Sequence, residues 1–319
     1  MLRDRIVRLY EDNEWEKLDY LTIIPIEPPL TLTITPYLYY DDPSDEEPMS
    51  LVIYISKDDG MSWDLYRSDW DPELEFFPKV HITTDCPIKI KCNLYSSSFG
   101  FETYMGDEMT FFSDKKFNLA GTPMSLLYGD NFKDKTEIPI RYCGFRYMFK
   151  DSLVVKILNP KTFLPATSLS GSYTYAEMFY NCVYLENAPE LPATKLSWAC
   201  YEGMFNGCTS LVKGPTILPS ITLVGDCYRY MFSRCRLLET APILPSTTLT
   251  SECYYYMFNG CNKLNYIKCD SLTPLNNSYS KNWVYAVSST GVFVKNKDAT
   301  WDNTFGVNAI PSGWTVITE

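Results

Sequence analysis

The hydrophobic and polar positions divide the chain into stretches of different periodicity. Residues 1–18 place apolar side chains at Leu2, Ile6 and Leu9, three or four positions apart, which predicts a helix. Such a helix either lies on its own domain, as ordinary amphipathic helices do, or docks into a partner protein. From residue 19 the pattern changes to short alternating runs, and from residue 120 it becomes a repeat.

Residues 19–119 are predicted to form a β-sandwich. The run LTIIPIEPPLTLTITPYLYY alternates and is rich in Thr, Ile and Tyr, and its prolines at 25, 28, 29 and 36 exclude a helix. Further runs bring the total to about six or seven short strands, which is the spacing of a two-sheet sandwich. These runs are SLVIYI, DLYRS, KVHITTDCPIKIKCNLY and MTFFSDKKFNL.

The segment SKDDGMSW, residues 56–63, predicts a tight hairpin because its glycine takes the positive φ that such a turn needs. It also resembles the Asp-box hairpin of sialidase propellers, where it is structural. A propeller needs several copies and this chain has one, so we expect the Asp58 side chain to cap the turn. A calcium loop is the alternative, but Asp58, Asp59 and Asp64 lack its further ligands. We interpret the acidic segment 41–48 as a solvated loop, with a cation site as its alternative.

Self-similarity dominates the C-terminal half of the chain. The pair Met-Phe recurs five times, at intervals of 30, 26, 27 and 26 residues, with a cysteine three residues after the Phe of the last four pairs. Constant spacing predicts a solenoid over residues 120–280, because one turn cannot bury its apolar face whereas stacked turns bury a continuous core. We expect neighbouring turns to lie about 4.8 Å apart where their strands pair. Residues 281–319 are predicted to form a C-terminal cap.

The recurring Met, Phe and Cys positions are the predicted core columns of this solenoid, and Ser152 takes the cysteine position in the first copy. A metal site needs three or four ligands that converge, whereas these cysteines recur once per turn. Free cysteine is a small buried filler, so we expect buried thiols, with a disulfide ladder as the alternative. The core positions are Met178, Phe179, Cys182, Cys200, Met204, Phe205, Cys208, Cys227, Met231, Phe232, Cys235, Cys253, Met257, Phe258 and Cys261.

The repeated unit, C-Y-x-x-M-F-x-x-C-x-x-L-x-x-A-P-x-L-P, resembles the BspA-like leucine-rich repeats of surface and adhesion proteins from anaerobic bacteria and protists, and of phages of gut bacteria. The resemblance covers about residues 142–267 and extends more loosely over 121–134. It implies binding and attachment and supplies no catalytic residues. This chain departs from the family in its short array of about five turns and in lacking an export signal at its start, where charged residues interrupt any apolar stretch.

Tyrosines cluster beside the Met-Phe pairs. The position three residues before Met holds Tyr in four copies, which indicates a partly structural role. The position directly before Met varies and holds Tyr147, Tyr230 and Tyr256, which we expect to lie on an exposed binding surface. Tyr contributes apolar area and a hydroxyl at low entropy cost, so we expect this surface to bind a protein or a glycan. The alternative is that these rings merely cover the solenoid.

Composition narrows the function classes. The formal net charge is −11, which argues against nucleic-acid binding and against docking on anionic lipid. A single histidine, His81, makes histidine-based catalysis and multi-histidine metal sites improbable. The sequence contains no catalytic, cofactor-binding or metal-binding motif that we recognise, and no apolar stretch reaches the 18 residues needed for membrane insertion.

These observations predict a mainly β protein with an N-terminal sandwich, a short leucine-rich-repeat-like solenoid and a C-terminal cap. We expect a non-enzymatic structural and adhesion protein without a cofactor. The hypothesis that unites surface attachment with the missing export signal is a bacteriophage head or tail fibre on the virion surface. Its partners would be other virion proteins, a host surface protein or a host glycan, and further copies of itself. The alternatives are an exported bacterial cell-surface adhesin and, third, a glycan-active enzyme.

Overall fold

The computed structural model describes residues 19–37, 50–69, 79–92, 108–138 and 144–319. These residues form many strands and only a few short helical segments, which confirms the mainly β prediction. The helical segments are α2 (Met124–Tyr128), η2 (Gly129–Asn131) and α3 (Asn277–Ser280). The predicted helix over residues 1–18, with Leu2, Ile6 and Leu9, lies outside the described residues, as do the acidic segment 41–48 and Cys143.

The N-terminal part contains two sheets. One is six-stranded in the order β10-β8-β1-β6-β3-β4 and the other is three-stranded in the order β5-β2-β7. All pairs are antiparallel except β8 with β10. The strands are β1 (Leu21–Pro25), β2 (Leu30–Tyr37), β3 (Ser50–Ser56), β4 (Asp64–Asp69), β5 (Val80–Thr84), β6 (Ile88–Cys92), β7 (Glu108–Ser113), β8 (Phe117–Ala120) and β10 (Val154–Ile157).

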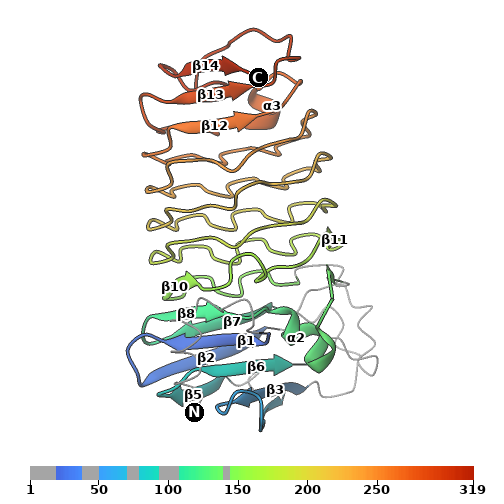
Figure 1. Ribbon diagram of the computed structural model, residues 1–319, viewed down its shortest axis with the longest axis vertical. Coiled ribbons are helices and arrows are strands. Elements are labelled where there is room, and N and C mark those ends of the chain that lie inside the picture. Colours follow the sequence, from blue (N-terminus) through green and yellow to red (C-terminus); the bar gives the residue numbers. More distant parts are fainter. Residues whose placement is uncertain (1–18, 38–49, 70–78, 93–107, 139–143) are drawn as a thin grey trace.

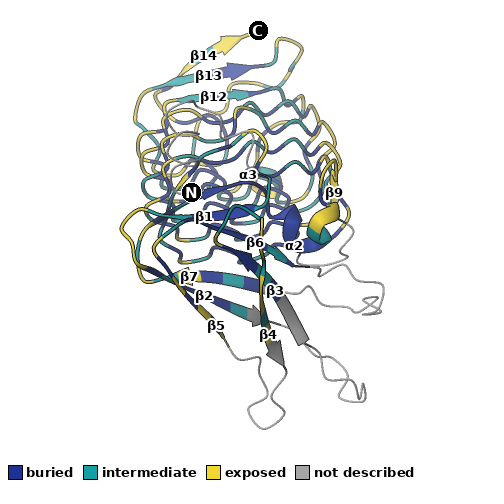
Figure 2. Cartoon of the chain, turned by 60° about the horizontal axis from the view of Figure 1, so that its bottom comes forward, coloured by how far each residue is buried: buried dark blue, intermediate teal, exposed yellow. Residues whose placement is uncertain are grey.

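Buried and exposed side chains alternate along these strands, and the buried ones lie in a common core. In β5 the pattern is buried, exposed, buried, exposed, buried, with Val80 and Ile82 inside and His81 outside. Figure 2 shows the buried parts of the chain in dark blue. This period of two follows from the pleat, in which successive side chains point to opposite faces. The outward His81 forms a hydrogen bond between its Nδ1 and the Thr33 hydroxyl on β2, at 3.0 Å.

The hairpin between β3 and β4 is the one that the sequence predicts. The Asp58 carboxylate accepts hydrogen bonds from the Ser62 amide and from the Ser56 hydroxyl, both at 2.8 Å. Gly60 has φ +87°, the left-handed conformation that the turn requires. The hydrogen bonds from Ser62 hold the pKa of Asp58 down to about 2. Asp58 therefore caps this turn, as expected for a structural hairpin.

The chain from residue 144 onward forms stacked turns joined by backbone hydrogen bonds (Figure 1). The Phe of each of the first four Met-Phe pairs donates its N–H to the Met carbonyl of the next turn, as in Phe179 to Met204 at 2.9 Å. The alternate amides bond within their own turn, as in Met178 to Tyr175 at 3.3 Å. The Met-Phe segment is therefore a chain of tight turns.

The short extended pieces lie elsewhere in each turn. Between residues 168 and 269 most parallel pairing consists of single bridges, such as Asn187 with Lys213 and Ile217 with Ile243. One short parallel pair joins β9 (Glu137–Ile138) to β11 (Ser168–Leu169). Proline after leucine in each turn removes the amide that a longer ladder would need.

The two N-terminal sheets continue directly into the stacked turns. β8 pairs in parallel with β10, and the carbonyl of Val155 in β10 accepts the amide of Glu186 in the next turn at 2.9 Å. On the other side, the Phe111 amide of β7 bonds to the Met148 carbonyl at 2.8 Å, in the same way as each later Phe. The buried residues of both parts belong to one hydrophobic cluster, so the two sheets close one end of the stack.

The far end of the stack is a parallel sheet of β12 (Tyr266–Cys269), β13 (Val292–Lys295) and β14 (Thr315–Thr318). The turn ladder runs past the predicted boundary at residue 281, since Phe258 bonds to the Trp283 carbonyl at 2.8 Å. Trp283 occupies the Met position of one further turn and is fully buried. Its indole N–H donates to the Ala309 carbonyl at 2.7 Å, which attaches the remaining chain over the end of the core.

Candidate binding surface

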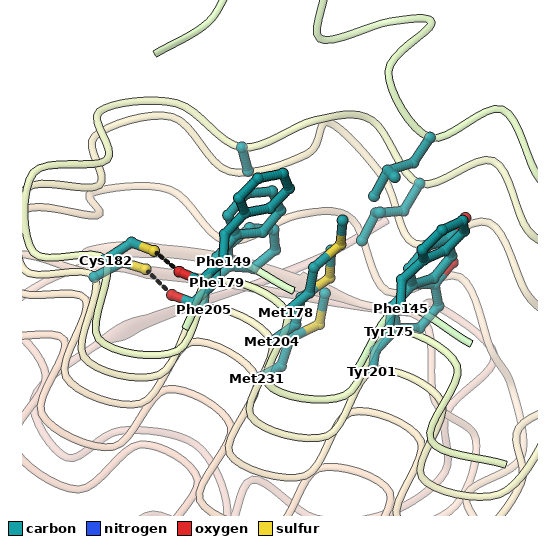
Figure 3. Packing of buried hydrophobic residues seen from close by; sticks show 14 of the residues in the cluster. Phe145, Phe149, Tyr175, Met178, Phe179, Cys182, Tyr201, Met204, Phe205 and Met231 are labelled. Carbon is teal, nitrogen blue, oxygen red and sulfur yellow. Dashed lines mark hydrogen bonds between the residues drawn. The ribbon is translucent and has the colours of Figure 1, made fainter. Parts of the chain in front are cut away.

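The core columns lie inside the stack. All fifteen Met, Phe and Cys positions predicted from the repeat are buried, with Phe above Phe and Met above Met (Figure 3). The Phe rings stack at centroid distances of 5.4–5.7 Å from Phe149 to Phe258. The tyrosines three residues before Met form a second column, stacked at 5.7–6.3 Å and 1% exposed. These tyrosines are wholly structural, which is more than the partial role expected for them.

The cysteine that follows each Met-Phe pair makes the same contact in every turn. Its thiol donates to the Phe carbonyl of the preceding turn, as in Cys182 to Phe149 at 2.8 Å and Cys208 to Phe179 at 3.0 Å. Ser152, which replaces this cysteine in the first copy, donates its hydroxyl to the Phe111 carbonyl of β7. The column therefore begins on β7 and is held together by a side-chain hydrogen bond between turns.

Burial decides the chemistry of these thiols. The cysteines of the described chain are free, and all but Cys86 are buried. Removal from water disfavours the thiolate, which raises the pKa of Cys200 to about 12 and that of Cys253 to about 11. Within the described ranges no three His, Cys, Asp or Glu side chains converge as a metal site would require. Neutral, hydrogen-bonded thiols fit the role of core filler.

Tyr147, Tyr230 and Tyr256 lie in one column on the outside of the stack. The residue directly before Met is left-handed in every copy, with φ between 51° and 58° at positions 147, 177, 203, 230 and 256. Its amide donates to the carbonyl two residues before Met in the next turn, as in Tyr230 to Tyr255 at 2.8 Å. Five such bonds in register place the column, and the positions beside it, on a single face. We call this surface the aromatic face.

One group on this face is the Tyr230 cluster, made of Arg229, Tyr230, Tyr255, Tyr256 and Lys281. The rings of Tyr230 and Tyr256 stack at 5.0 Å with an interplanar angle of 25°. Tyr255 packs against both, and the Arg229 guanidinium lies 5.3 Å from the Tyr230 centroid and 5.0 Å from that of Tyr255. Asn282 donates to the Tyr256 hydroxyl at 2.8 Å. The tyrosines are half-buried and held in place by one another.

The second group is the Tyr147 cluster, made of Arg146, Tyr147, Lys150, Tyr173 and Trp198. The Arg146 guanidinium lies 4.4 Å from the Tyr147 centroid and 4.7 Å from that of Tyr173, and Lys150 is 4.4 Å from the Tyr147 centroid. Trp198 meets Tyr173 edge to face at 4.9 Å and is 46% exposed. Arginine and aromatic side chains again alternate along the stack.

A gap in the column separates the two clusters. Gly203 stands where its neighbours carry tyrosine or glutamate, and a Cβ there would lie 3.1 Å from the Glu177 side chain. Glu177 and Glu202 border this gap, 3.9 Å from Arg146 and 3.6 Å from Arg229. Arg229 also pairs with Asp226 at 3.4 Å and Glu252 at 3.0 Å. Burial raises the pKa of Glu202, because the attraction of Arg229 offsets only part of the cost of removing the carboxylate from water.

The sequence identified three tyrosines of this face and missed most of the side chains around them. Arg146, Glu202 and Arg229 lie two residues before Met, and Lys281 lies two residues before Trp283, so their signal was the same period read one column further. A further column of left-handed residues lies five residues before Met and includes Tyr173, Asp226 and Glu252. Trp198 carries no such mark, because its ring is placed by the stacking of its turn over Gly225 and by its contact with Tyr173.

Comparisons with family models, with curated proteins and with solved structures found no match to this chain. Across the described segments, no helix has the length and apolar character needed to cross a membrane. The described chain is a mainly β protein whose stacked turns carry the aromatic face.

Proposed function

We propose that this chain is a non-enzymatic structural and adhesion protein, a head-fibre or tail-fibre component of a bacteriophage virion. Its architecture is interpreted as a β-sandwich followed by a leucine-rich-repeat-like solenoid of the BspA type and a terminal cap. The observation that carries the proposal is the pair of hydrogen-bonded ladders that continue from the two sheets into the stack. A rod with one core transmits force along its length and presents its side faces to partners.

In this proposal, residues 1–119 dock to the virion and the solenoid points outward. The aromatic face then contacts a host surface protein, a host glycan or another virion protein. Fibres are usually symmetric oligomers, so we expect several copies per attachment point. The Asp-box hairpin supports a structural role over a glycan-active enzyme, because the Asp58 carboxylate is occupied by hydrogen bonds from Ser56 and Ser62.

The test is the location of the chain in a culture that produces it. Virions are purified by density-gradient centrifugation, analysed by mass spectrometry and labelled with antibody against residues 144–319 in electron micrographs. We expect the chain in the virion fraction at a fixed ratio to the capsid protein, with label on projecting fibres. Recovery in the cell envelope of a phage-free culture would instead support the alternative of a bacterial surface adhesin.

A further inference from the structure

A buried lysine of the six-stranded sheet faces two carboxylates. Lys89, on β6, has a side chain that is 6% exposed, and its Nζ lies 2.9 Å from the Asp59 carboxylate and 3.2 Å from the Asp19 carboxylate. Asp59 belongs to the turn between β3 and β4, whereas Asp19 lies two residues before β1. Among the ion pairs of the described residues, Lys89 is the lysine that contacts two carboxylates.

Lys89 and Asp59 are shielded from water. The Asp59 side chain is 10% exposed, and the Lys89 Nζ lies 5.5 Å from the centroid of the Tyr20 ring. Tyr20 packs in turn against Trp63 and Phe132, with ring centroids 5.0 Å apart in both pairs. Burial of an ion pair costs free energy, because both charges lose their hydration. Condensation of the two groups to a neutral amide removes that cost, and a site that excludes water favours the loss of a water molecule.

Asp19 can carry the proton that such a condensation has to move. Burial raises the pKa of Asp19, but the charge and the hydrogen bond of Lys89 outweigh burial and lower that pKa, so the carboxylate is ionised and can accept a proton. The amine and the Asp59 carboxyl group are held in contact by the fold. Their reaction therefore needs no encounter between separate molecules, which removes a large part of its entropic barrier.

We propose that Lys89 and Asp59 condense to an isopeptide bond, with Asp19 carrying a proton between them. The Lys89 ammonium passes one proton to the Asp59 carboxylate, and the neutral amine attacks the Asp59 Cγ. Asp19 takes a second proton from the attacking nitrogen and passes it to the departing oxygen. The C–N bond forms, one C–O bond of Asp59 breaks and water leaves. Asp19 ends ionised, as it began, and no oxidant or reductant takes part.

The bond joins the β3–β4 hairpin to its neighbouring strand. Ser56 of β3 lies opposite Lys89 in the sheet, and the hairpin forms the edge of that sheet away from the stacked turns (Figure 1). Asp19 keeps Lys133 as an ionic partner, 3.6 Å away, after the charge of Lys89 is lost. A covalent bond at this edge prevents the hairpin from separating from β6. This role goes beyond the proposed function and does not depend on it.

Intact-mass spectrometry of the denatured whole chain tests the bond. We expect the wild type to be lighter than its sequence by one water molecule. Lys89→Gln exchanges two side chains of almost equal mass, so this variant should be heavier than the wild type by one water. The matched control is Lys91→Gln on the same strand, because Lys91 pairs with the carboxylate of Asp130 and should leave the mass deficit unchanged.

Two further variants separate the condensation from mere proximity. Asp59→Gly should restore the full mass, and glycine readily adopts the left-handed φ of 67° at this position, so the turn is kept. Asp19→Asn leaves both reacting groups in place and removes the proton carrier, so the full mass should return here as well. A mass deficit that persists in Asp19→Asn would overturn the role of Asp19.

A tryptic digest locates the bond. We expect a branched peptide that joins residues 58–67 to the peptide containing Lys89, with no cleavage after Lys89. Asp59 precedes Gly60, and an Asp-Gly sequence can also lose water by closing to a succinimide, which mild alkali hydrolyses. A deficit that lies in a linear peptide, or that disappears in mild alkali, would therefore overturn the proposal. So would a folded wild-type chain that has the full mass of its sequence.

Discussion

At the residue scale, the cysteine column shows that a single side-chain hydrogen bond explains which residues occupy one position of the repeat. Cys182, Cys208, Cys235 and Cys261 each donate to a Phe carbonyl one turn earlier, at 2.8–3.1 Å. Ser152 makes the equivalent bond to Phe111 at the start of the column. Because serine and cysteine both serve, the position requires a small donor and not thiol chemistry.

The buried thiols predict a loss of stability in alkali. Their pKa values are raised in the folded chain, to about 12 for Cys200, against about 8.5 for an exposed thiol in the unfolded chain. A raised folded pKa means that stability is complete below pH ~8.5 and falls as pH rises toward the folded value, by about 1.4 kcal/mol per pH unit for each thiol. We expect the urea midpoint to be constant from pH 6 to 8 and to fall steeply between pH 9 and 11.

The control for this prediction is a variant with Cys208 and Cys235 replaced by serine, which does not titrate. Its midpoint at neutral pH should remain close to that of the wild type, and its decline in alkali should be shallower. A wild-type midpoint that stays constant to pH 10.5 would show that the thiols are not buried in solution.

At the element scale, the unit of this array is a chain of tight turns with left-handed residues every four positions. In the turn around Met204 these are Ala199, Gly203 and Gly207. Most copies use Asp, Asn, Tyr, Glu or Arg at such positions, although a left-handed backbone costs about 1 kcal/mol for a residue with a Cβ. The hydrogen bonds between turns offset this cost.

Gly207 gives a direct measure of that cost. Its φ is +81°, and a Cβ there would meet Asn181 at an ordinary distance of 3.4 Å, so backbone strain is the main effect of substitution. Gly207→Ala should lower stability by about 1 kcal/mol. Gly214→Ala is the matched control, since its φ is not left-handed and its Cβ would lie 3.5 Å from Leu238. Urea unfolding should show a lower midpoint for the first variant and an equal or higher midpoint for the second.

At the scale of the whole molecule, the two N-terminal sheets and the stacked turns share one core. Phe111 of β7 bonds to Met148, accepts from Ser152 and packs its ring 5.5 Å from Phe149. It therefore acts as the Phe of a turn that precedes the first repeat. The described residues thus share one hydrophobic cluster, and Figure 1 shows their layers stacked from β3 to β14.

Because β7 and the first repeat are joined in this way, we expect a substitution in the core of β7 to destabilise the first repeat as well. Phe111→Ala removes a fully buried ring and should lower stability by about 3–5 kcal/mol. Hydrogen exchange measured by mass spectrometry should show lost protection in residues 144–158 as well as in β7. Phe112→Ala is the control, because Phe112 is 38% exposed on the same strand and should leave that protection unchanged. Loss of protection confined to β7 would mean that the two parts are independent.

The sequence by itself determined the repeat, the mainly β class, the hairpin capped by Asp58 and the burial of the Met, Phe and Cys columns, because each of these follows from local periodicity or turn chemistry. The roles of Phe111 and Trp283 follow only from the folded chain, because Phe111 departs from the repeat spacing and Trp283 replaces the repeat's Met, and hydrogen bonds to Met148 and from Phe258 show that both belong to the array. The aromatic face belongs to the same category. Tyr147, Tyr230 and Trp198 become neighbours of arginines and carboxylates only when successive turns stack in register.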